Sequence, residues 1–471
     1  MQHSTFVGPT SGHGVDGSLG TYARRVRRLA LGRGSRGSSA ALRRLPLVAG
    51  LGLAMTLGLP AAAANAATVQ STPASWTPYL LKSPVSQVVE ELEPCNGTMY
   101  AVGTLTAIGR GSATYTRSNA FSFSATTGVM TSWAPQVNGS VRSIAFSPDC
   151  STAYLGGTFS SVNGVAATNL VAVDAVTGAV RTGFAHNANA AVNTVRYTHG
   201  AVVIGGAFTS VNGASRSKMA SLSPTTGAAT SYLKLAFAGV YPNTGQTRVY
   251  DSHLSHAGDK LLIVGVFTSI GGQPRQQAAV LDLGGSTVTV DGWTSAELAQ
   301  PCVQGWYVRS GAWSPDDSRI YFATTGYKPS SGPGSDTSQP RAGLCDAAVA
   351  FPATSTSVQH LWINYTGCDS YYSVAADADN VYVSGHERWA NNPYGCDYAG
   401  PGAVSRPGIA SMDPRTGLVT AWNPTRSLGV GSHQLLVTGA GLWVASDTWK
   451  DGNAQMCGGQ LKHGGICFLP Y

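Results

Sequence analysis

Three features of the sequence together predict an all-β fold, a seven-bladed β-propeller built from four-stranded antiparallel blades. First, three near-identical nonapeptides, Gly156–Gly164, Gly205–Gly213 and Val264–Gly272, recur at intervals of about 50 to 60 residues. Second, seven apolar segments carry this motif or a relative of it. Third, an aromatic motif occurs near both ends of the chain. A repeated unit of this size cannot bury its apolar face alone, so neighbouring units must cover it.

Each repeat is expected to open with an apolar strand a, as in Val141–Phe146, Val192–Tyr197 and Val308–Trp313. A polar turn leads into strand b, which carries the glycine motif. The seven expected b strands are residues 100–103, 154–157, 202–206, 261–265, 320–324, 381–385 and 442–446. Strand c alternates, as in Leu170–Asp174, and ends at a Thr-Gly turn, where glycine supplies the positive φ that a tight hairpin requires.

Strand d is expected to end on an aromatic residue, and six such residues follow the c strands: Trp133, Phe184, Tyr232, Trp293, Trp362 and Trp422. The missing seventh lies near the start of the chain, where Ser75-Trp76-Thr77-Pro78 is similar to the segments around Trp133 and Trp422. The chain itself stops after an expected strand c, Gly465–Leu469. We therefore expect the mature N-terminus to pair as the outer strand of the last blade, which closes the ring and removes exposed edges. The propeller then spans residues 67–471.

Residues 1–66 have the pattern of a cleaved signal peptide. An arginine-rich stretch leads into the apolar run Leu45–Leu59, and Ala64-Asn65-Ala66 supplies the small residues of a cleavage site. The run is shorter than the about 20 residues that a membrane span needs, so a retained anchor helix is the less favoured alternative. The protein is therefore expected to be secreted and extracellular, with no membrane span after cleavage.

The formal net charge of +7 is confined to this segment. Eight of the 30 basic residues lie in residues 1–66 with one of the 23 acidic residues, which leaves 22 of each sign in the mature chain. Binding of nucleic acid needs a basic face on the folded protein. No nucleic acid partner is therefore expected.

The pattern Gly-Gly-x-Phe-x-Ser-Val-Asn-Gly, followed by an apolar strand and a Thr-Gly turn, resembles the delta-sixty repeat of secreted bacterial propellers. The likeness is strongest over residues 150–285 and weakens towards both ends. The resemblance implies a propeller with an extracellular binding role, and it carries no fixed set of catalytic residues. Within the motif we expect core side chains at Phe159, Phe208 and Phe267 and turn residues at Asn163 and Asn212.

The eight cysteines are expected to form four disulfides, because an exported chain folds in an oxidising compartment. Their spacing lacks the C-x-x-C pattern of a zinc site. Eight cysteines allow many pairings, and their placement in equivalent turns and loops favours the set Cys95–Cys150, Cys302–Cys345, Cys368–Cys396 and Cys457–Cys467.

Binding is expected where the repeat is broken, since loops on a rigid scaffold carry function. The connections from strand b to strand c are enlarged in the last three blades, at residues 326–345, 385–408 and 447–465. Such connections share one face, so the three loops should form one patch. Aromatic planes beside amides and carboxylates suit a sugar ring and its hydroxyl groups, although a protein epitope would also accept them. The expected ligand-binding residues are Glu387, Arg388, Trp389, Asn391, Tyr394, Asp397, Tyr398 and Trp449.

The leading hypothesis is a secreted, lectin-like carbohydrate-binding propeller whose partner is a glycan or a cell-surface polysaccharide. A related hypothesis is a lectin subunit that assembles with other secreted proteins, similar in layout to the umbrella toxin particles of filamentous bacteria.

Two alternatives stay open. The rival site is the mouth of the central channel, lined by residues of the a strands: Arg142, Asn193, Tyr250, Asp251, Arg309, Tyr372, His433 and Gln434. The rival function is an extracellular glycoside hydrolase or polysaccharide lyase, with Glu387 and Asp397 as acid and base or nucleophile. The sequence contains no hydrolase elbow, metalloprotease motif, phosphate loop or EF-hand loop, so binding is favoured over catalysis and no cofactor or metal is expected.

Overall fold

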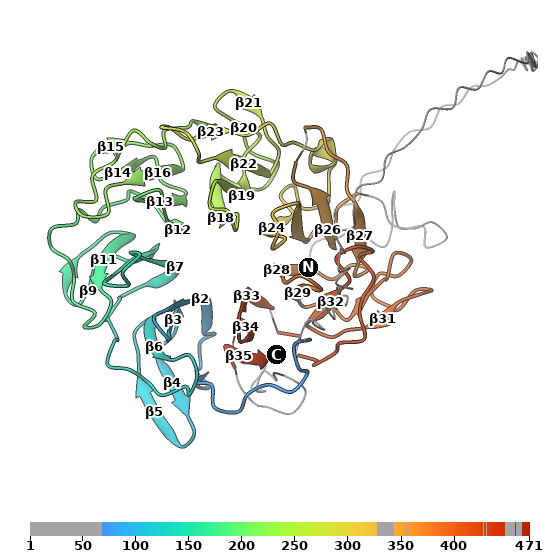
Figure 1. Cartoon of the computed structure of the whole chain (residues 1–471), viewed down its shortest axis with the longest axis horizontal. Coiled ribbons are helices and arrows are strands. Elements are labelled where there is room, and N and C mark those ends of the chain that lie inside the picture. Colours follow the sequence, from blue (N-terminus) through green and yellow to red (C-terminus); the bar gives the residue numbers. More distant parts are fainter. Residues whose placement is uncertain are drawn as a thin grey trace, which may run out of the picture. The chain divides into compact units, whose positions relative to one another are not determined.

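The structure is a computed structural model that describes residues 68–326, 343–354, 356–426, 428–429, 431–447, 457 and 464–471. The expected signal peptide, residues 1–66, lies outside these ranges. The described elements are β-strands, apart from one turn of 3-10 helix, η1 (Ala296–Ala299). Figure 1 shows the strands grouped into sheets that stand side by side around a common centre.

Seven sheets of the described residues repeat one antiparallel pattern, and we call them the first to the seventh sheet in chain order. The first sheet contains β2 (Val88–Cys95), β3 (Thr98–Thr104) and β6 (Ala120–Ser124), and the second contains β7 (Ser140–Phe146), β8 (Thr152–Thr158) and β11 (Leu170–Asp174). The third contains β12 (Val192–Thr198), β13 (Ala201–Gly206) and β16 (Met219–Leu222), and the fourth contains β18 (Arg248–Leu254), β19 (Lys260–Val266), β22 (Ala278–Asp282) and β23 (Thr289–Val290).

The fifth sheet contains β24 (Val308–Trp313), β25 (Arg319–Thr324), β26 (Ala347–Pro352) and β27 (Trp362–Tyr365). The sixth contains β28 (Tyr371–Ala376), β29 (Val381–Gly385) and β32 (Ala410–Met412), and the seventh contains β33 (Ser432–Thr438), β34 (Gly441–Ser446) and β35 (Ile466–Pro470). The first strand of each sheet lies nearest the centre (Figure 1). The seven expected b strands coincide with β3, β8, β13, β19, β25, β29 and β34.

The expectation of four strands in every sheet is wrong. Only the fourth and fifth of these seven sheets have a fourth strand in the described residues. In four others the outer segment contributes a single bridge: Phe123↔Met130, Val173↔Val180, Leu222↔Ala229 and Met412↔Val419. The outer segment ends on a buried aromatic side chain such as Trp133 or Phe184, so the chain turns inward after one pair. Short outer edges also limit pairing with other chains.

The repeated nonapeptide folds as a small hairpin between strands b and c. These hairpins are β9 (Ser161–Val162) with β10 (Val165–Ala166), β14 (Ser210–Val211) with β15 (Ala214–Ser215), and β20 (Ser269–Ile270) with β21 (Gln273–Pro274). In the sixth sheet, β30 (Trp389–Ala390) and β31 (Val404–Ser405) pair at the equivalent place, across the enlarged loop. β17 (Phe237–Ala238) adds to β20, and β1 (Tyr79–Leu80), β4 (Ala107–Arg110) and β5 (Ala113–Thr116) form a separate three-stranded sheet. The turn residues Asn163 and Asn212 have φ values of 51° and 48°, as the motif predicts.

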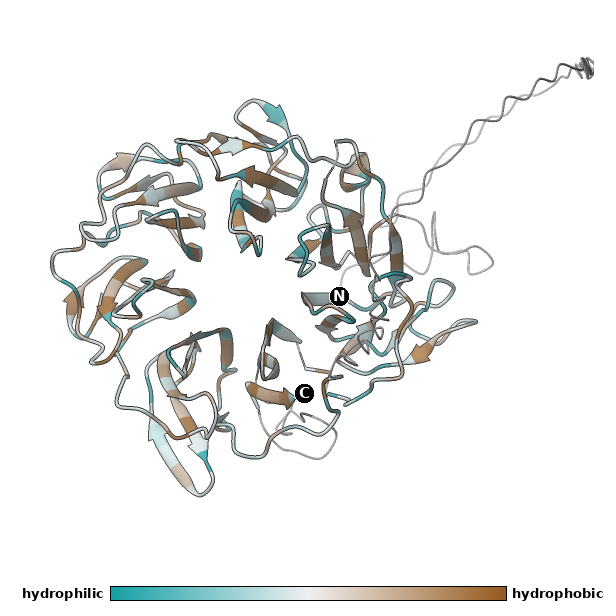
Figure 2. Ribbon diagram, in the orientation of Figure 1, coloured by the Kyte–Doolittle hydropathy of each residue, from teal (hydrophilic) through white to brown (hydrophobic). Residues whose placement is uncertain are grey.

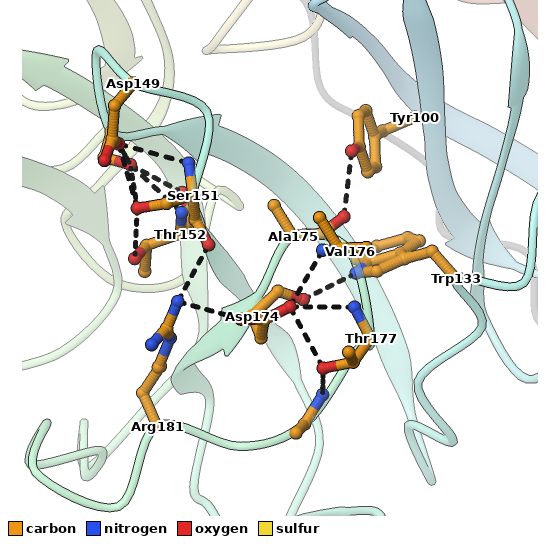
Figure 3. Close-up of polar contacts among 12 residues, drawn as sticks. Tyr100, Trp133, Asp149, Ser151, Thr152, Asp174, Ala175, Val176, Thr177 and Arg181 are labelled. Carbon is orange, nitrogen blue, oxygen red and sulfur yellow. Dashed lines mark hydrogen bonds and ion pairs between the residues drawn. The ribbon is translucent and has the colours of Figure 1, made fainter.

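The apolar core lies between neighbouring sheets. Phe159, Phe208 and Phe267 are buried in it, as expected, and Figure 2 shows hydrophobic residues concentrated on the strands. Polar tips of the core aromatics cross from one sheet to the next. The Trp133 Nε1 donates to the Asp174 carbonyl at 3.1 Å, and the Tyr100 hydroxyl donates to the Ala175 carbonyl at 2.9 Å (Figure 3). These bonds satisfy buried donors while they fix the angle between adjacent sheets.

Both ends of the described chain meet at the seventh sheet. The Gln70 amide donates to the Pro470 carbonyl at 2.7 Å, and the Ala74 amide donates to the Phe468 carbonyl at 2.8 Å. The Trp76 ring lies 5.6 Å from the Phe468 ring, measured between centroids. Side chains of the first and seventh sheets share one core cluster. The N-terminal segment itself is not a regular strand between residues 68 and 78.

The cysteines form the four pairs that their placement predicts: Cys95–Cys150, Cys302–Cys345, Cys368–Cys396 and Cys457–Cys467. The first pair joins the first and second sheets, and the others fasten loops of the fifth, sixth and seventh. No helix among the described residues is long and apolar enough to cross a membrane.

Candidate functional site

Each of the seven inner strands contains a β-bulge at the same place. The register with strand b shifts by one residue near the start of the inner strand. The unpaired residues are Glu90, Arg142, Asn193, Tyr250, Arg309, Tyr372 and His433. A bulge re-aims a side chain without ending the sheet, and all seven of these side chains line one cavity.

The bulge also explains the glycine of the repeat. In the first four sheets and the sixth, the residue opposite the bulge is a glycine of strand b, such as Gly157 or Gly206. A Cβ at Gly157 would overlap the carbonyl oxygen of Ser140, and one at Gly206 would overlap that of Ala191. The glycine therefore permits the close approach of two backbones that the bulge demands.

The cavity occupies the centre of the seven sheets and has a volume of about 730 Å³. All eight channel residues expected from the sequence line it, including Asp251 and Gln434 beside the bulge residues. The sequence did not indicate Glu90, Glu93, Arg196, His253 or Trp306, which also line the wall.

The residue after each bulge is polar, and most of these side chains bridge neighbouring sheets. The seven residues are Glu91, Ser143, Thr194, Asp251, Ser310, Ser373 and Gln434. Glu91 Oε2 accepts from the Ile144 amide at 2.8 Å, and Ser143 Oγ accepts from the Val195 amide at 2.9 Å. Gln434 Oε1 of the seventh sheet accepts from the Leu92 amide of the first sheet at 2.7 Å. This polar belt holds the inner strands, and hence the bulge residues, at fixed spacings.

Deeper in the channel the wall is divided into a charged side and an apolar side. Glu93, Arg196 and His253 project from the first, third and fourth sheets, whereas the fifth to seventh sheets contribute Ala312, Ala375 and Leu436. Glu93 keeps some contact with the lumen. The surrounding protein nevertheless raises its pKa to about 8, first by desolvation and then through the Glu91 carboxylate.

Most charges that face the cavity are paired inside it. Arg196 Nη1 lies 2.8 Å from Glu91 Oε1, and its Nη2 lies 3.7 Å from Asp251 Oδ1. His433 Nδ1 lies 2.7 Å from Glu90 Oε2. Burial disfavours the charged forms of both His433 and Glu90. The attraction of the Glu90 carboxylate is stronger than this effect and raises the pKa of His433. The same contact lowers the pKa of Glu90, so each group of the pair favours the charged form of the other.

A four-layer stack forms the wall where the fourth and fifth sheets meet. The Tyr250 and Trp306 rings are parallel within 10°, with their centroids 3.9 Å apart. Arg248 covers the Tyr250 ring at 5.0 Å, and Arg309 covers the Trp306 ring at 4.1 Å, measured from each guanidinium carbon to the ring centroid. Cation–π contacts of this kind hold planar groups in fixed orientations.

The enlarged loop of the sixth sheet, residues 385–408, is described, whereas most of the other two enlarged loops, and Trp449 with them, lie outside the described residues. Cys368–Cys396 fastens this loop. Arg388 lies 2.8 Å from both Asp369 and Asp397, and its guanidinium covers the Trp389 ring at 4.5 Å. Trp389 and Tyr394 are half-buried, and Tyr398 is exposed.

Two of the expected loop residues do not lie where the sequence indicated. Asn391 was expected to face a ligand, but it is a turn residue with φ 52°, and its Oδ1 accepts from Asn364 Nδ2 at 2.5 Å. It repeats the structural role of Asn163 in the second sheet. Glu387 was expected on the loop surface and is fully buried.

The burial of Glu387 follows from the repeat. The Glu387 carbonyl accepts from the Gly408 amide just as that of Phe159 accepts from Asn169 and that of Phe208 from Lys218. A glutamate therefore occupies the core phenylalanine position of the sixth sheet. Its two carboxyl oxygens have no hydrogen-bond partner in the described part of the chain. Desolvation raises its pKa well above the usual value, so it does not form a surface acid–base pair with Asp397.

The loop of the sixth sheet nevertheless reaches the channel. The His386 ring, next to Glu387, lies 5.5 Å from the Tyr372 ring in an edge-to-face contact. The channel mouth and this loop therefore border one another at a bulge residue.

Comparison with solved structures identifies the architecture. The structure of U3-55K matches with a TM-score of 0.50 at 10% identity, over 85% of this chain and 100% of that one. The WD40 repeats of RRP9 match with a TM-score of 0.50 at 10% identity, over 86% and 99%. WD40 repeats form β-propellers. This chain is a β-propeller. At such identity the likeness shows the fold alone, and no protein-family model or curated protein matches the sequence.

Proposed function

We propose that this protein is a secreted, lectin-like, carbohydrate-binding β-propeller that holds its ligand at the mouth of the central channel. The ring of seven bulge residues around the cavity of about 730 Å³ carries the proposal. It sets the aromatic side chain of Tyr372 beside polar groups whose positions are fixed by internal bonds, such as Asn193. Sugars bind through apolar ring faces and through hydroxyl groups that need fixed partners, and cavities of this volume suit small ligands.

We propose that the ligand extends from the channel onto the loop of the sixth sheet. The contact between His386 and Tyr372 makes the two surfaces continuous. The exposed Tyr398 and the half-buried Trp389 then offer further apolar contact, and the Cys368–Cys396 disulfide limits the freedom that this loop loses on binding.

We further propose that the sheets form a closed ring of seven blades, completed by the mature N-terminus. The hydrogen bonds from Gln70 and Ala74 to the last strand support this closure, as does the core shared by the first and seventh sheets. The bond between Gln434 and Leu92 connects the same two sheets at the channel. Closure removes the edges that would otherwise pair with other chains.

Secretion after cleavage of residues 1–66 fits four disulfides in one chain. The hairpin formed by each nonapeptide supports repeats of the delta-sixty type. A lectin of this kind could serve within a larger extracellular assembly such as an umbrella toxin particle. Recovery of the chain from culture supernatant without residues 1–66 tests secretion. Co-purification of other secreted proteins with it tests the larger assembly.

Calorimetric titration of the mature, oxidised protein with a panel of soluble polysaccharides tests the proposed function. We expect binding, and we expect Tyr372→Ala to weaken it about tenfold or more. Tyr115→Ala, on β5 and away from both the channel and the loop of the sixth sheet, is the matched control and should leave affinity unchanged. Loss of binding in Tyr398→Ala but not in Tyr372→Ala would move the site to the loop, and no binding to any glycan would overturn the function.

A further inference from the structure

Arg309 has no acidic partner among the described residues, and it shares this with Arg142 among the basic residues that line the channel. Its Nη2 donates to Gln304 Oε1 at 2.7 Å. Its Nε is buried and has no acceptor in the described part of the chain. No carboxylate of the described residues forms an ion pair with it, whereas Arg196 and His433 are each paired. Arg309 is therefore an uncompensated positive charge on the cavity wall.

The surroundings of Arg309 hold the guanidinium in place without neutralising it. The Trp306 ring covers one face at 4.1 Å, and Trp306 is itself stacked on Tyr250. Desolvation lowers the pKa of Arg309, and only the Tyr372 and Tyr250 phenols oppose that shift. A partly desolvated charge without a counter-ion is costly to the fold. A ligand anion at this place would supply the missing partner.

The carboxylates at the mouth are engaged by groups other than Arg309, so none of them occupies the place of its counter-ion. Glu90 is paired with His433 at 2.7 Å, and Arg142 is bonded to Asn193 beside them. Glu91 and Asp251 are both engaged by Arg196. A guanidinium binds a carboxylate through charge-assisted hydrogen bonds, and Nη1 is the Arg309 nitrogen that neither donates to Gln304 nor is buried without an acceptor.

We propose that Arg309 forms an anion subsite that receives the carboxylate of a uronic acid residue, so that the ligand is an acidic polysaccharide. This assignment rests on the proposed function, because it names the class of glycan that the channel mouth binds. The sugar ring then lies beside Tyr372, and its hydroxyl groups face Asn193 and the pair formed by Glu90 and His433.

The test compares matched polymers that differ only in charge. Polygalacturonate and alginate are titrated into the mature, oxidised protein beside the same polymers with their carboxyl groups reduced to alcohols. We expect the acidic forms to bind about 10- to 100-fold more tightly, as for a charge-assisted hydrogen bond. The preference should shrink as the salt concentration rises.

Variants of Arg309 test whether this residue is the source of the preference for acidic polymers. Arg309→Gln should bind acidic and reduced polymers alike, and Arg309→Lys should keep part of the preference. Arg415→Gln, which changes an exposed arginine on an outer turn, is the control that should retain all of it. Circular dichroism and the thermal midpoint establish that each variant is folded.

The outcomes separate the two proposals. Equal binding of acidic and reduced polymers, or a preference that survives Arg309→Gln, overturns the anion subsite and leaves the glycan-binding function standing. Binding of sulfated dextran alone overturns the carboxylate assignment. Failure of every acidic, reduced and neutral polymer to bind overturns both.

Discussion

Replacement of Glu387 by glutamine should change the way in which stability depends on pH. Glu387 occupies a core position that is phenylalanine in other repeats, and it is fully buried. The groups near it are the Tyr371 phenol, the Asp369 carboxylate and the Arg426 guanidinium. Asp369 and Arg426 are bound to Arg388 and Asp447, so neither neutralises the Glu387 carboxyl fully. Desolvation dominates and raises the pKa of Glu387 well above the value of 4.5 for an exposed glutamate.

The direction in which the free energy of unfolding changes with pH follows from the number of protons that each state binds. Between about pH 4.5 and the raised pKa, the folded state holds one proton on Glu387 that the unfolded chain has released. Stability conferred by the protonated form is therefore lost as the pH rises through that window. Each pH unit within that window costs up to about 1.4 kcal/mol. Glutamine has the same shape and does not titrate, so Glu387→Gln should lack this decline.

Urea unfolding of the oxidised protein, followed by tryptophan fluorescence at several pH values, measures the effect. The free-energy difference between the wild type and Glu387→Gln should widen as the pH rises above 5, by up to about 1.4 kcal/mol per pH unit. Asp379→Asn, at an exposed turn, is the control and should run parallel to the wild type. Parallel curves for Glu387→Gln would show that Glu387 is ionised at neutral pH, and the argument from desolvation would fail.

Three further predictions concern closure, the loop and the channel. Trp76→Ala should destabilise the protein by about 1–3 kcal/mol if the N-terminus completes the seventh sheet, and an unchanged urea midpoint would refute the closure. Serine at both Cys368 and Cys396 opens a loop of 28 residues, which should cost about 3–4 kcal/mol in the chain-entropy account, and a loss below about 1 kcal/mol would contradict it. Because the pKa of Glu93 is about 8, affinity for polygalacturonate should fall about threefold or more from pH 7 to pH 9. Glu93→Gln should abolish that fall, and a fall of the same size in this variant would exclude Glu93 as its source.

The sequence carried enough information to place the inner three strands of the repeat, because apolar periodicity and the glycine motif mark them. Strand c at Leu170–Asp174 was predicted to the residue. The outer strands were overestimated, since an aromatic residue marks where the chain turns inward and not how many pairs it makes before turning. The number of residue pairs between the outer segment and strand c depends on the backbone geometry at the edge of the sheet. The spacing of residues in the sequence does not indicate it.

The channel residues were partly predictable for the same reason, since they lie at the start of recognisable strands. Glu90 escaped notice because the strand Val88–Cys95 carries three glutamates and does not read as an apolar strand. Trp306 lies in a loop before β24. The alternation of side chains that predicts their direction in a strand does not apply to a loop. Glu387 could have been placed correctly, because alignment of Gly385 with Gly157 puts it at the position of Phe159.

The seven bulges separate the residues that face the cavity from the residues that build the sheets. Here the unpaired residue of every inner strand contributes nothing to the ladder of hydrogen bonds, so it can vary from copy to copy while the copies stay superimposable. Single substitutions at these seven positions can therefore change the chemistry of the cavity wall while the pairing of the strands stays the same.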